Sequence, residues 1–198
     1  MRGPPARPAG RPIPGLTGAR TRLATGGRER DDWYRTPPHV TEALLAREAF
    51  GPIVWDPCCG DGAMAEVVGR QHVVVASDLV DRGFGTPRVD FLLEGARRAD
   101  HMIVNPPFRL ADEFALWALQ LGVTKLAVLQ RLAWLEGMGR HAALWGPRPP
   151  ARVWVFAARA TLWRGDDPNP PNRGGVMALA WYVWESGHQG APALGWIA

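Results

Sequence analysis

The sequence predicts an α/β fold in which helices cover a mostly parallel sheet. Short continuous apolar runs alternate along the chain with stretches whose apolar residues recur at helical spacing. Several of the runs end in a carboxylate or an amide, and a glycine-containing turn follows the first of them. This alternation is typical of βαβ units, whose parallel strands bind ligands beyond their carboxyl ends. We therefore expect the chemistry of the protein at that edge of the sheet.

The composition indicates a single globular domain. The chain has 198 residues, of which 46% are apolar and ten are tryptophan, enough for one real core. No uninterrupted apolar segment approaches the ~20 residues that span a bilayer, so we expect a cytoplasmic protein that binds no membrane. Cys58 and Cys59 are adjacent, which suits neither an ordinary disulfide nor the paired spacing of a zinc site. We expect both to be reduced and structural.

Residues 1–30 differ in composition from the rest of the chain. They are rich in Pro, Gly, Arg and Ala without periodicity, and they hold seven arginines against one glutamate. Such a segment cannot bury enough apolar surface to order itself. We expect a disordered basic arm over 1–30 and one domain over 31–198. The arm is either a phosphate-binding tail or an extension without function, and the sequence leaves both open.

The domain opens with a helix and a buried strand. Apolar positions recur at helical spacing over 40–50, and Thr36 followed by proline makes a favourable N-cap and first turn. The helix should end near Gly51, which a proline follows. The apolar run Ile53–Asp56 then predicts the first strand of the sheet.

A glycine turn follows the first strand. It contains Gly60 and Gly62 and leads into a helix expected over 63–70. Glycines at this place let the backbone approach a ligand closely at a helix N-terminus. The second strand ends in Asp78, 22 residues after Asp56, close to the ~20 residues that place an acid on ribose hydroxyls. The turn and the acid together predict binding of a nucleotide-like cofactor.

The alternation continues to the end of the chain. We expect further strands at 89–92, 101–104, 125–130, 152–156 and 176–184, and further helices at 111–120 and 132–145. Only about twenty residues without a helical pattern separate the last two strands. These two strands should therefore pair as an antiparallel hairpin.

The most informative stretch is Asn105-Pro106-Pro107-Phe108, which ends the apolar run His101–Val104. Two prolines halt the backbone at the carboxyl end of the strand. There the Asn105 oxygen and the Pro106 carbonyl can accept the two hydrogens of a planar amino group, while the Phe108 ring stacks on a flat substrate. The tetrapeptide favours transfer to a delocalised amino nitrogen. The alternative is a simple turn after a core strand.

Several motifs in order resemble a known family. Asp56-Pro57-Cys58-Cys59-Gly60-Asp61-Gly62 resembles the first S-adenosylmethionine motif of the amino methyltransferases, and the Asn-Pro-Pro-Phe tetrapeptide resembles their catalytic motif. Three further segments resemble phage and prophage DNA N6-adenine methyltransferases: Tyr34-Arg35-Thr36-Pro37, Leu135-Glu136-Gly137 and Ala180-Trp181-Tyr182-Val183-Trp184-Glu185. The resemblance covers 31–198. It implies the Rossmann-like class I methyltransferase fold, a seven-stranded sheet with an antiparallel last strand and helices on both faces.

The resemblance also implies a role for each motif residue. The residues implied in catalysis are Asn105, Pro106, Pro107 and Phe108. The residues implied in binding S-adenosyl-L-methionine are Asp56, Pro57, Gly60 and Gly62 at its methionine end, Asp78 at its ribose, Asp90 and Phe91 at its adenine, and Tyr34, Thr36 and Pro37 in a segment that closes over the methionine. Phenylalanine stands where the family more often has tyrosine, which keeps the stacking face and loses a hydroxyl.

The expected reaction is direct transfer of a methyl group to N6 of adenine in DNA, with no metal. Positioning and electrostatics would supply most of the acceleration, and a duplex adenine would have to be flipped out of the stack. Asp61 and His101 are the candidates for a general base, but Asp61 belongs to the glycine turn and His101 starts a strand. The alternatives that remain are RNA adenine or protein glutamine N5 methylation, an inactive nucleic-acid-binding module, and a nicotinamide-binding fold.

Little of the chain is left to read a DNA sequence. The expected elements use nearly all of residues 40–198, and 159–175 is the only free loop. Since each good base contact gives only about 1–3 kcal/mol of discrimination, we expect a very short or relaxed target site. Affinity would then come largely from phosphate contacts, and the arginines of the arm are the concentrated source of positive charge.

Overall fold

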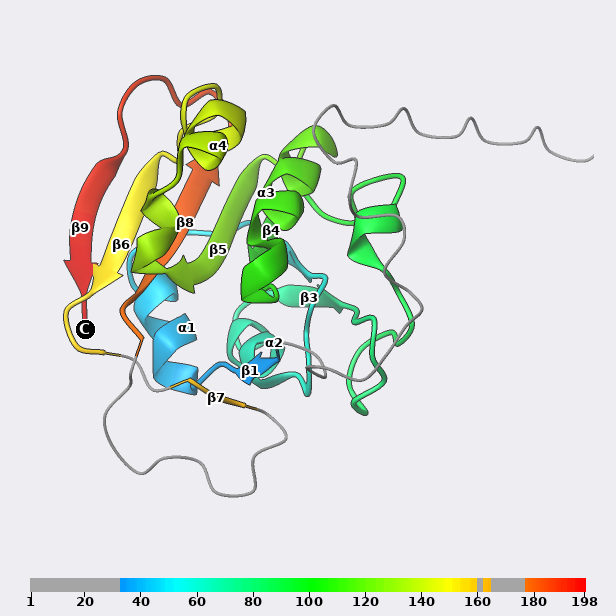
Figure 1. Ribbon diagram of the computed structural model, residues 1–198. Coiled ribbons are helices and arrows are strands. Elements are labelled where there is room, and N and C mark those ends of the chain that lie inside the picture. Colours follow the sequence, from blue (N-terminus) through cyan, green and yellow to red (C-terminus); the bar gives the residue numbers. More distant parts are fainter. Residues whose placement is uncertain (1–32, 160–161, 165–176) are drawn as a thin grey trace, which may run out of the picture. The chain divides into compact units, whose positions relative to one another are not determined.

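The computed structural model describes residues 33–159, 162–164 and 177–198. The chain divides into two units, 1–30 and 31–198. The predicted disordered arm lies outside the described residues. The fold below is that of the second unit (Figure 1).

Seven strands form one mixed sheet in the order β3-β2-β4-β5-β8-β6-β9. Strand β8 runs antiparallel to both of its neighbours, β5 and β6, and the other neighbouring strands are parallel. The predicted seven-stranded sheet and the antiparallel pairing of β6 with β8 are confirmed, but the antiparallel strand that was predicted to be the last is followed in the chain by β9, which runs parallel to β6. The strands are β2 (Ile53–Asp56), β3 (Val73–Ala76), β4 (His101–Val104), β5 (Lys125–Arg131), β6 (Arg152–Phe156), β8 (Leu179–Glu185) and β9 (Ala193–Ile197).

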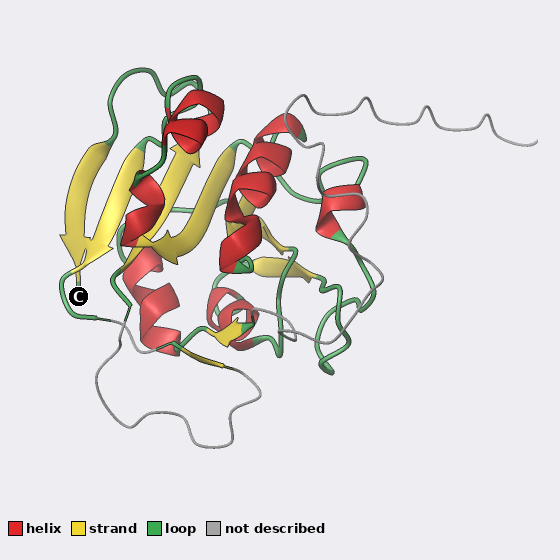
Figure 2. Cartoon of the chain, in the orientation of Figure 1, coloured by secondary structure: helices red, strands yellow, loops and turns green. Residues whose placement is uncertain are grey.

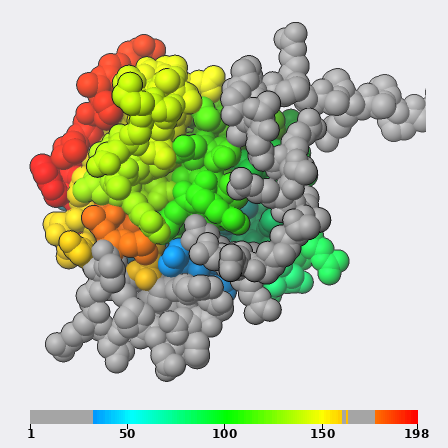
Figure 3. Space-filling view, viewed as in Figure 1, coloured from blue at the N-terminus to red at the C-terminus, as the bar shows by residue number. Residues whose placement is uncertain are grey.

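Helices cover both faces of the sheet, as predicted (Figure 2). Alternate strand residues point to opposite faces, so Trp55 and Met102 pack in the cluster that contains the third helix, whereas Val54 and Ile103 pack in the cluster that contains the first two. In the space-filling view, the green third helix and the yellow-green segment after β5 cover one face (Figure 3). The α-helices are α1 (Pro38–Leu45), α2 (Ala63–Val68), α3 (Ala111–Gln120) and the single turn α4 (Met138–Arg140).

The expected strand over 89–92 is wrong. Residues Phe91–Leu93 form a short 3-10 helix, η2, because the side chain of Asp90 accepts a hydrogen bond from the backbone N–H of Leu92 at 3.0 Å and caps it. The seventh strand is β9 instead, which adds to the edge of the sheet beside β6. Sequence reasoning missed β9 because Leu194 and Trp196 are exposed and give it no core-facing pattern.

The expected single helix over 132–145 is also wrong. The segment divides into the 3-10 helix η4 (Leu132–Leu135), the turn α4 and the π-helix η5 (His141–Trp145). Gly137 has a φ of 117°, which a helix interior does not allow, and Arg140 donates to the backbone carbonyls of Trp134 and Glu136. Helix α1 ends at Leu45, earlier than predicted.

A second, two-stranded sheet lies outside the main one. Strand β1 (Tyr34–Arg35) pairs antiparallel with β7 (Trp163–Arg164). This pairing holds the segment before α1 against a segment from the far end of the sequence. The loop 159–175, expected to read DNA, lies largely outside the described residues.

A network of charges around the buried Glu48 and Lys125 lies at the amino ends of β5 and β6, and we call it the amino-edge network: Glu48, Lys125, Arg152 and Glu185. Glu48 accepts from Lys125 at 2.7 Å, from Arg152 at 2.9 Å and from the Trp154 indole at 2.7 Å. Burial alone would raise the pKa of Glu48, but the hydrogen bonds from Arg152, Lys125 and Trp154 outweigh it and lower that pKa. Arg152 also pairs with Glu185 at 2.6 Å.

Within the described ranges, every helix is too short or too polar to traverse a bilayer. The same ranges contain no group of three or more His, Cys, Asp or Glu side chains placed to hold a metal ion.

Candidate active site

The turn that joins β2 to α2 brings two glycines to the carboxyl edge of the sheet. Gly60 and Gly62 have φ values of 57° and 90°, a left-handed conformation that glycine adopts without strain. A Cβ at Gly60 would stand 2.5 Å from the Trp33 indole, and one at Gly62 would stand 2.5 Å from the Phe84 ring. Only glycine fits at either position, and flat aromatic groups pack directly on this backbone.

Asp56 and Asp78 lie together at the ends of the neighbouring strands β2 and β3, and both are buried. One oxygen of Asp78 accepts the backbone N–H of Gly60 at 2.8 Å. The other accepts the N–H of Val80 at 2.8 Å and the guanidinium of Arg82 at 3.0 Å. Asp78 therefore ties the glycine turn to the end of β3.

The carboxyl of Asp56 is less well satisfied. Its Oδ1 accepts the backbone N–H of Cys58 at 3.2 Å, whereas its buried Oδ2 has no hydrogen-bond partner among the described residues. Burial, with the nearby charge of Asp78, raises the pKa of Asp56 to about 8 against the lowering effect of the Cys58 hydrogen bond. At neutral pH the free protein thus holds this carboxyl protonated, and a cation brought to Oδ2 would favour its ionised form.

The two cysteines of the turn are free thiols, as predicted. Burial raises the pKa of Cys58 well above its ordinary value and that of Cys59 to about 12, and the charges of Asp56 and Asp78 add to both shifts. Because the thiolate is the reactive form, neither cysteine is a nucleophile at neutral pH.

Asn105 follows β4 and lies beside the segment 34–37. Its amide nitrogen donates to the backbone carbonyl of Tyr34 at 3.1 Å and to the hydroxyl of Thr36 at 2.9 Å. Both amide hydrogens are thereby used, which leaves the Asn105 carbonyl oxygen as the group that can accept from a ligand. Thr36 was expected to be the N-cap of α1, but Pro37 takes that position.

The rest of the tetrapeptide turns the chain into the 3-10 helix η3 (Phe108–Leu110). Pro106 is buried, and the carbonyl of Pro107 accepts the N–H of Leu110 at 2.8 Å. The carbonyl of Phe108 accepts from the buried side chain of Gln130 at 3.2 Å. These bonds fix the backbone of the tetrapeptide on the end of β5.

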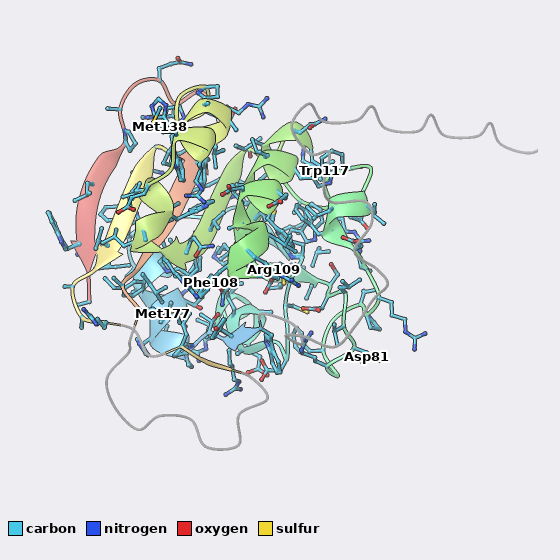
Figure 4. The ribbon with its side chains drawn as sticks, viewed as in Figure 1. Asp81, Phe108, Arg109, Trp117, Met138 and Met177 are labelled. Carbon is cyan, nitrogen blue, oxygen red and sulfur yellow. The ribbon has the colours of Figure 1, made fainter. Side chains whose placement is uncertain are left out.

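The Phe108 ring is half-buried, at the start of the segment that leads into α3 (Figure 4). It stacks on the Tyr34 ring with a centroid separation of 5.1 Å and an interplanar angle of 19°. The guanidinium of Arg131, which ends β5, lies 4.6 Å from the Phe108 centroid. Flat groups thus already contact the ring that was expected to stack on a substrate.

A pocket joins these two parts of the site. Its lining includes Tyr34 and Thr36 from the segment before α1, Asn105 from the tetrapeptide, and Cys58, Cys59 and Asp61 from the glycine turn. The fold therefore brings the turn after β2 and the tetrapeptide after β4 to one opening, as expected of neighbouring parallel strands.

Other predicted site residues lie away from this pocket. The Phe91 ring is only 2% exposed and packs between Trp55 and Phe114 in the core, with centroid separations of 5.2 and 4.8 Å. Asp90 caps η2, and Pro57 is buried in the turn after β2. Their assignment to the cofactor stays a prediction.

The two candidates for a general base, Asp61 and His101, both interact with other residues. Asp61 pairs with Arg35 at 2.6 Å. His101 starts β4 and accepts the backbone N–H of Gly51 at 2.6 Å, and burial together with the charge of Lys125 lowers its pKa. Neither arrangement points to proton abstraction at the tetrapeptide.

Sequence reasoning missed four residues that contact the motifs. Gln130 could have been found, because it is a polar side chain at the carboxyl end of an apolar strand. Arg131 follows it directly. Trp33 and Phe84 lie in segments without periodicity, and no local signal places them on the glycine turn.

No protein-family model matches the sequence, and no curated protein is significantly similar to it. The fold is similar to that of the modification subunit of a putative type I restriction enzyme from Vibrio vulnificus, with 16% identity, a TM-score of 0.49 and coverage of 76% of this chain and 44% of that one. The chain thus spans less than half of that subunit. A predicted O-methyltransferase from Agrobacterium tumefaciens shows 16% identity, a TM-score of 0.49 and coverage of 81% and 85%.

A third similar structure is magnesium protoporphyrin IX methyltransferase from Synechocystis with bound S-adenosylmethionine. It shows 14% identity, a TM-score of 0.47 and coverage of 74% of this chain and 76% of that one. Similarity at this level identifies neither the cofactor nor the substrate of this chain.

Proposed function

We propose that this protein transfers a methyl group from S-adenosyl-L-methionine to the N6 amino group of adenine in DNA, at a short or relaxed target site. The observation that carries the proposal is the orientation of the Asn105 amide. Its nitrogen is held by Tyr34 and Thr36, so its oxygen is the atom that would accept from an incoming donor, with the Phe108 ring three residues further along the chain. An amino group conjugated to a flat ring is the donor that matches both features.

The residues of the glycine turn fit the cofactor. The buried, unpartnered Oδ2 of Asp56 suits the cationic amino group of its methionine part. The Oδ2 of Asp78 accepts one hydrogen bond, from Gly60, and keeps a lone pair for a ribose hydroxyl. When bound, S-adenosylmethionine supplies a methyl group on a positively charged sulfur. Trp33 and Phe84 would have to shift from the glycines or pack on the ligand.

The remaining predicted residues are assigned to the same cofactor. Thr36 and Pro37 would close over its methionine part from the side of the pocket that they line or adjoin. Asp90, with the backbone beside Phe91, would meet its adenine. The Phe91 ring would support this contact from the core and would not stack on the adenine itself.

The chain's own residues would act mainly by positioning. The Asn105 oxygen and the Pro106 carbonyl would each accept one hydrogen of the amino group, which turns its nitrogen lone pair toward the pocket. Gln130 would hold the tetrapeptide still through its bond to the Phe108 carbonyl. Asp56, paired with the cofactor, would lose its proton. No side chain in this arrangement needs to act as a strong base before transfer.

The test is product analysis with cofactor that carries an isotopically labelled methyl group. Unmethylated DNA, RNA and glutamine-containing peptides are incubated separately with the protein, digested and analysed by mass spectrometry. The proposal predicts N6-methyladenine in DNA as the main product. Label in RNA adenine or in glutamine would move the activity to one of the alternatives, and label in none would leave an inactive nucleic-acid-binding module.

The same DNA, once sequenced for methylated adenines, tests target specificity. We expect a short or relaxed motif. A strict motif of about six base pairs needs many base contacts, at about 1–3 kcal/mol each, and finding one would contradict this part of the proposal.

A further inference from the structure

The stacked pair of Tyr34 and Phe108 joins two parts of the sequence that were assigned to different ligands. Sequence resemblance placed Tyr34 on the cofactor and Phe108 on the acceptor. In the structure their rings are nearly parallel, at 19°, with centroids 5.1 Å apart. Tyr34 lines the pocket, and both side chains are half-buried, so part of each is exposed without unfolding of the core.

We infer that Tyr34 is the second wall of the acceptor site, so that the target base inserts between the rings of Tyr34 and Phe108. The inference rests on the proposed function and names the chemistry of its acceptor as a flat heterocycle. A base held between two rings needs a gap of about 3.5 Å on each side, so the two rings would have to separate to about 7 Å.

The separation requires Tyr34 to move by about 2 Å, and its surroundings permit this. Among the described residues, strand β1 has two residues and pairs with the two-residue β7. Short two-stranded pairings of this kind are marginal on their own. Phe108, by contrast, is fixed through its carbonyl to Gln130, which is 2% exposed in the sheet. Phe108 is thus held in place, whereas Tyr34 can move.

The backbone of Tyr34 links this slot to the group that would bind the amine. The carbonyl of Tyr34 accepts from the Asn105 amide nitrogen at 3.1 Å. A base between the two rings would therefore present its edge to the Asn105 oxygen, and displacement of Tyr34 would move a partner of Asn105. Stacking and recognition of the amino group are coupled through one residue.

A slot of this kind favours a nucleobase over the side chain of glutamine. An aromatic wall stabilises each stacked base, whereas a primary amide has a much smaller flat surface and gains less from a second ring. Arg131 already lies 4.6 Å from the centre of the Phe108 ring, which shows that this ring accepts a flat cationic partner. The structure thus assigns selectivity for bases to Tyr34.

The test compares Tyr34→Leu with Tyr34→Phe, and uses Trp196→Leu as a control because Trp196 is a 63% exposed aromatic residue on the edge strand β9. Binding of a fluorescent unmethylated duplex is measured by anisotropy with saturating S-adenosylhomocysteine, and cofactor affinity is measured by calorimetry. Tyr34→Leu should weaken duplex binding by about 5- to 150-fold, the range that loss of one stacking ring gives. Cofactor affinity should change by less than about threefold.

Tyr34→Phe should restore duplex binding, and Trp196→Leu should leave both affinities unchanged. Equal losses of cofactor and duplex affinity in Tyr34→Leu would return Tyr34 to the cofactor site and overturn the inference, as would unchanged duplex binding. A wild-type protein that binds the duplex but methylates no DNA would refute the proposed function alone. A protein that binds neither duplex nor single strands would refute both.

Discussion

Buried polar groups are paired at the amino ends of β5 and β6, whereas two at the carboxyl ends of β2 and β3 have no hydrogen-bond partner among the described residues. In the amino-edge network, Glu48 receives hydrogen bonds from Lys125, Arg152 and Trp154. At the opposite edge, Asp56 keeps a buried oxygen without a partner among the described residues. The same sheet thus carries satisfied charges at one edge and unsatisfied groups at the other.

The difference separates structural charges from those that await a ligand. A buried charge that lacks a partner is costly, so a fold retains one where a ligand completes it or where the group stays neutral. Glu48 has a lowered pKa and is ionised, whereas Asp56 has a pKa raised to about 8 and is protonated in the free protein. We therefore expect substitutions at the amino edge to change stability and those at the carboxyl edge to change binding and transfer.

The largest expected effect is the loss of stability in Glu48→Ala. Removal of this carboxylate takes the nearest counter-ion from the buried Lys125 and leaves the exposed Glu185 as the remaining partner of Lys125 and Arg152, at a cost of about 3–5 kcal/mol in the free energy of unfolding. Urea denaturation measures the free energy of unfolding. Glu42→Ala is the matched control, because the ion pair of Glu42 with Arg70 is exposed and its loss should cost less than about 1 kcal/mol. Equal costs in the two variants would remove the distinction between the edges.

Asp78→Ala should weaken binding of S-adenosylmethionine by about 10- to 150-fold, corresponding to the 1.5–3 kcal/mol of one hydrogen bond to a charged group. The structure adds a second reason, because Asp78 also holds the backbone of Gly60. Calorimetry measures the affinity. Asp81→Ala, at an exposed carboxylate on the same loop, should bind normally. Unchanged affinity in Asp78→Ala would remove the ribose assignment.

The raised pKa of Asp56 predicts a specific dependence of stability on pH. Because the folded-state pKa lies above the ordinary value, this group stabilises the fold at low pH, and that contribution is lost as the pH rises through about 8. Asp56→Asn mimics the protonated form and removes the dependence. As the pH rises from 6 to 9, the free energy of unfolding of the variant should increase relative to that of the wild type by about 1 kcal/mol or more, since each pKa unit is worth about 1.4 kcal/mol.

Urea denaturation of both proteins at pH 6 and pH 9 measures this gain. Saturating S-adenosylmethionine should reduce it, since the cationic ligand stabilises the ionised carboxylate of the wild type alone. A constant difference between the two proteins across this pH range would mean that Asp56 is ionised in the free fold, contrary to its burial.

The smallest expected effect is that of Phe108→Tyr. The ring face is kept, and a hydroxyl is added to a half-buried side chain, so the transfer rate should change by no more than about two- to threefold, or roughly 0.5 kcal/mol. Phe108→Leu, which removes the ring, should be far slower at equal cofactor affinity. If leucine performs as well as tyrosine, stacking is not the role of this position.

The sequence predicted the regular elements best where an apolar run is bounded by residues that stop it. The bounds of β4 and α3 agree with the prediction because Asn105 and two prolines end the strand and Gly122 follows the helix closely. The prediction failed where a single side chain decided the conformation, as Asp90 does by capping η2. The edge strand β9 gave no signal because its outer residues are exposed.

The candidate site could be predicted only as separate motifs. The tetrapeptide and the glycine turn could both be identified in the sequence, and the topology places them at the carboxyl ends of the neighbouring strands β4 and β2. The contacts between these motifs and their partners could not be predicted, because Tyr34 and Thr36 lie about seventy residues before Asn105 and contact it only in the folded chain. Thr36 was accordingly expected to cap α1, and the structure instead uses its hydroxyl to orient the Asn105 amide.

The most direct test of the proposed reaction is methyl transfer by Asn105→Ala measured beside its cofactor affinity. Removal of the oxygen that accepts an amine hydrogen should lower the transfer rate to DNA adenine by at least about 100- to 1000-fold, as loss of one preorganised hydrogen-bonding group in a transition state does. Affinity for S-adenosylmethionine should stay within a few-fold of the wild type. A variant that methylates adenine at the wild-type rate would show that Asn105-Pro106-Pro107-Phe108 is only a turn and would contradict the account.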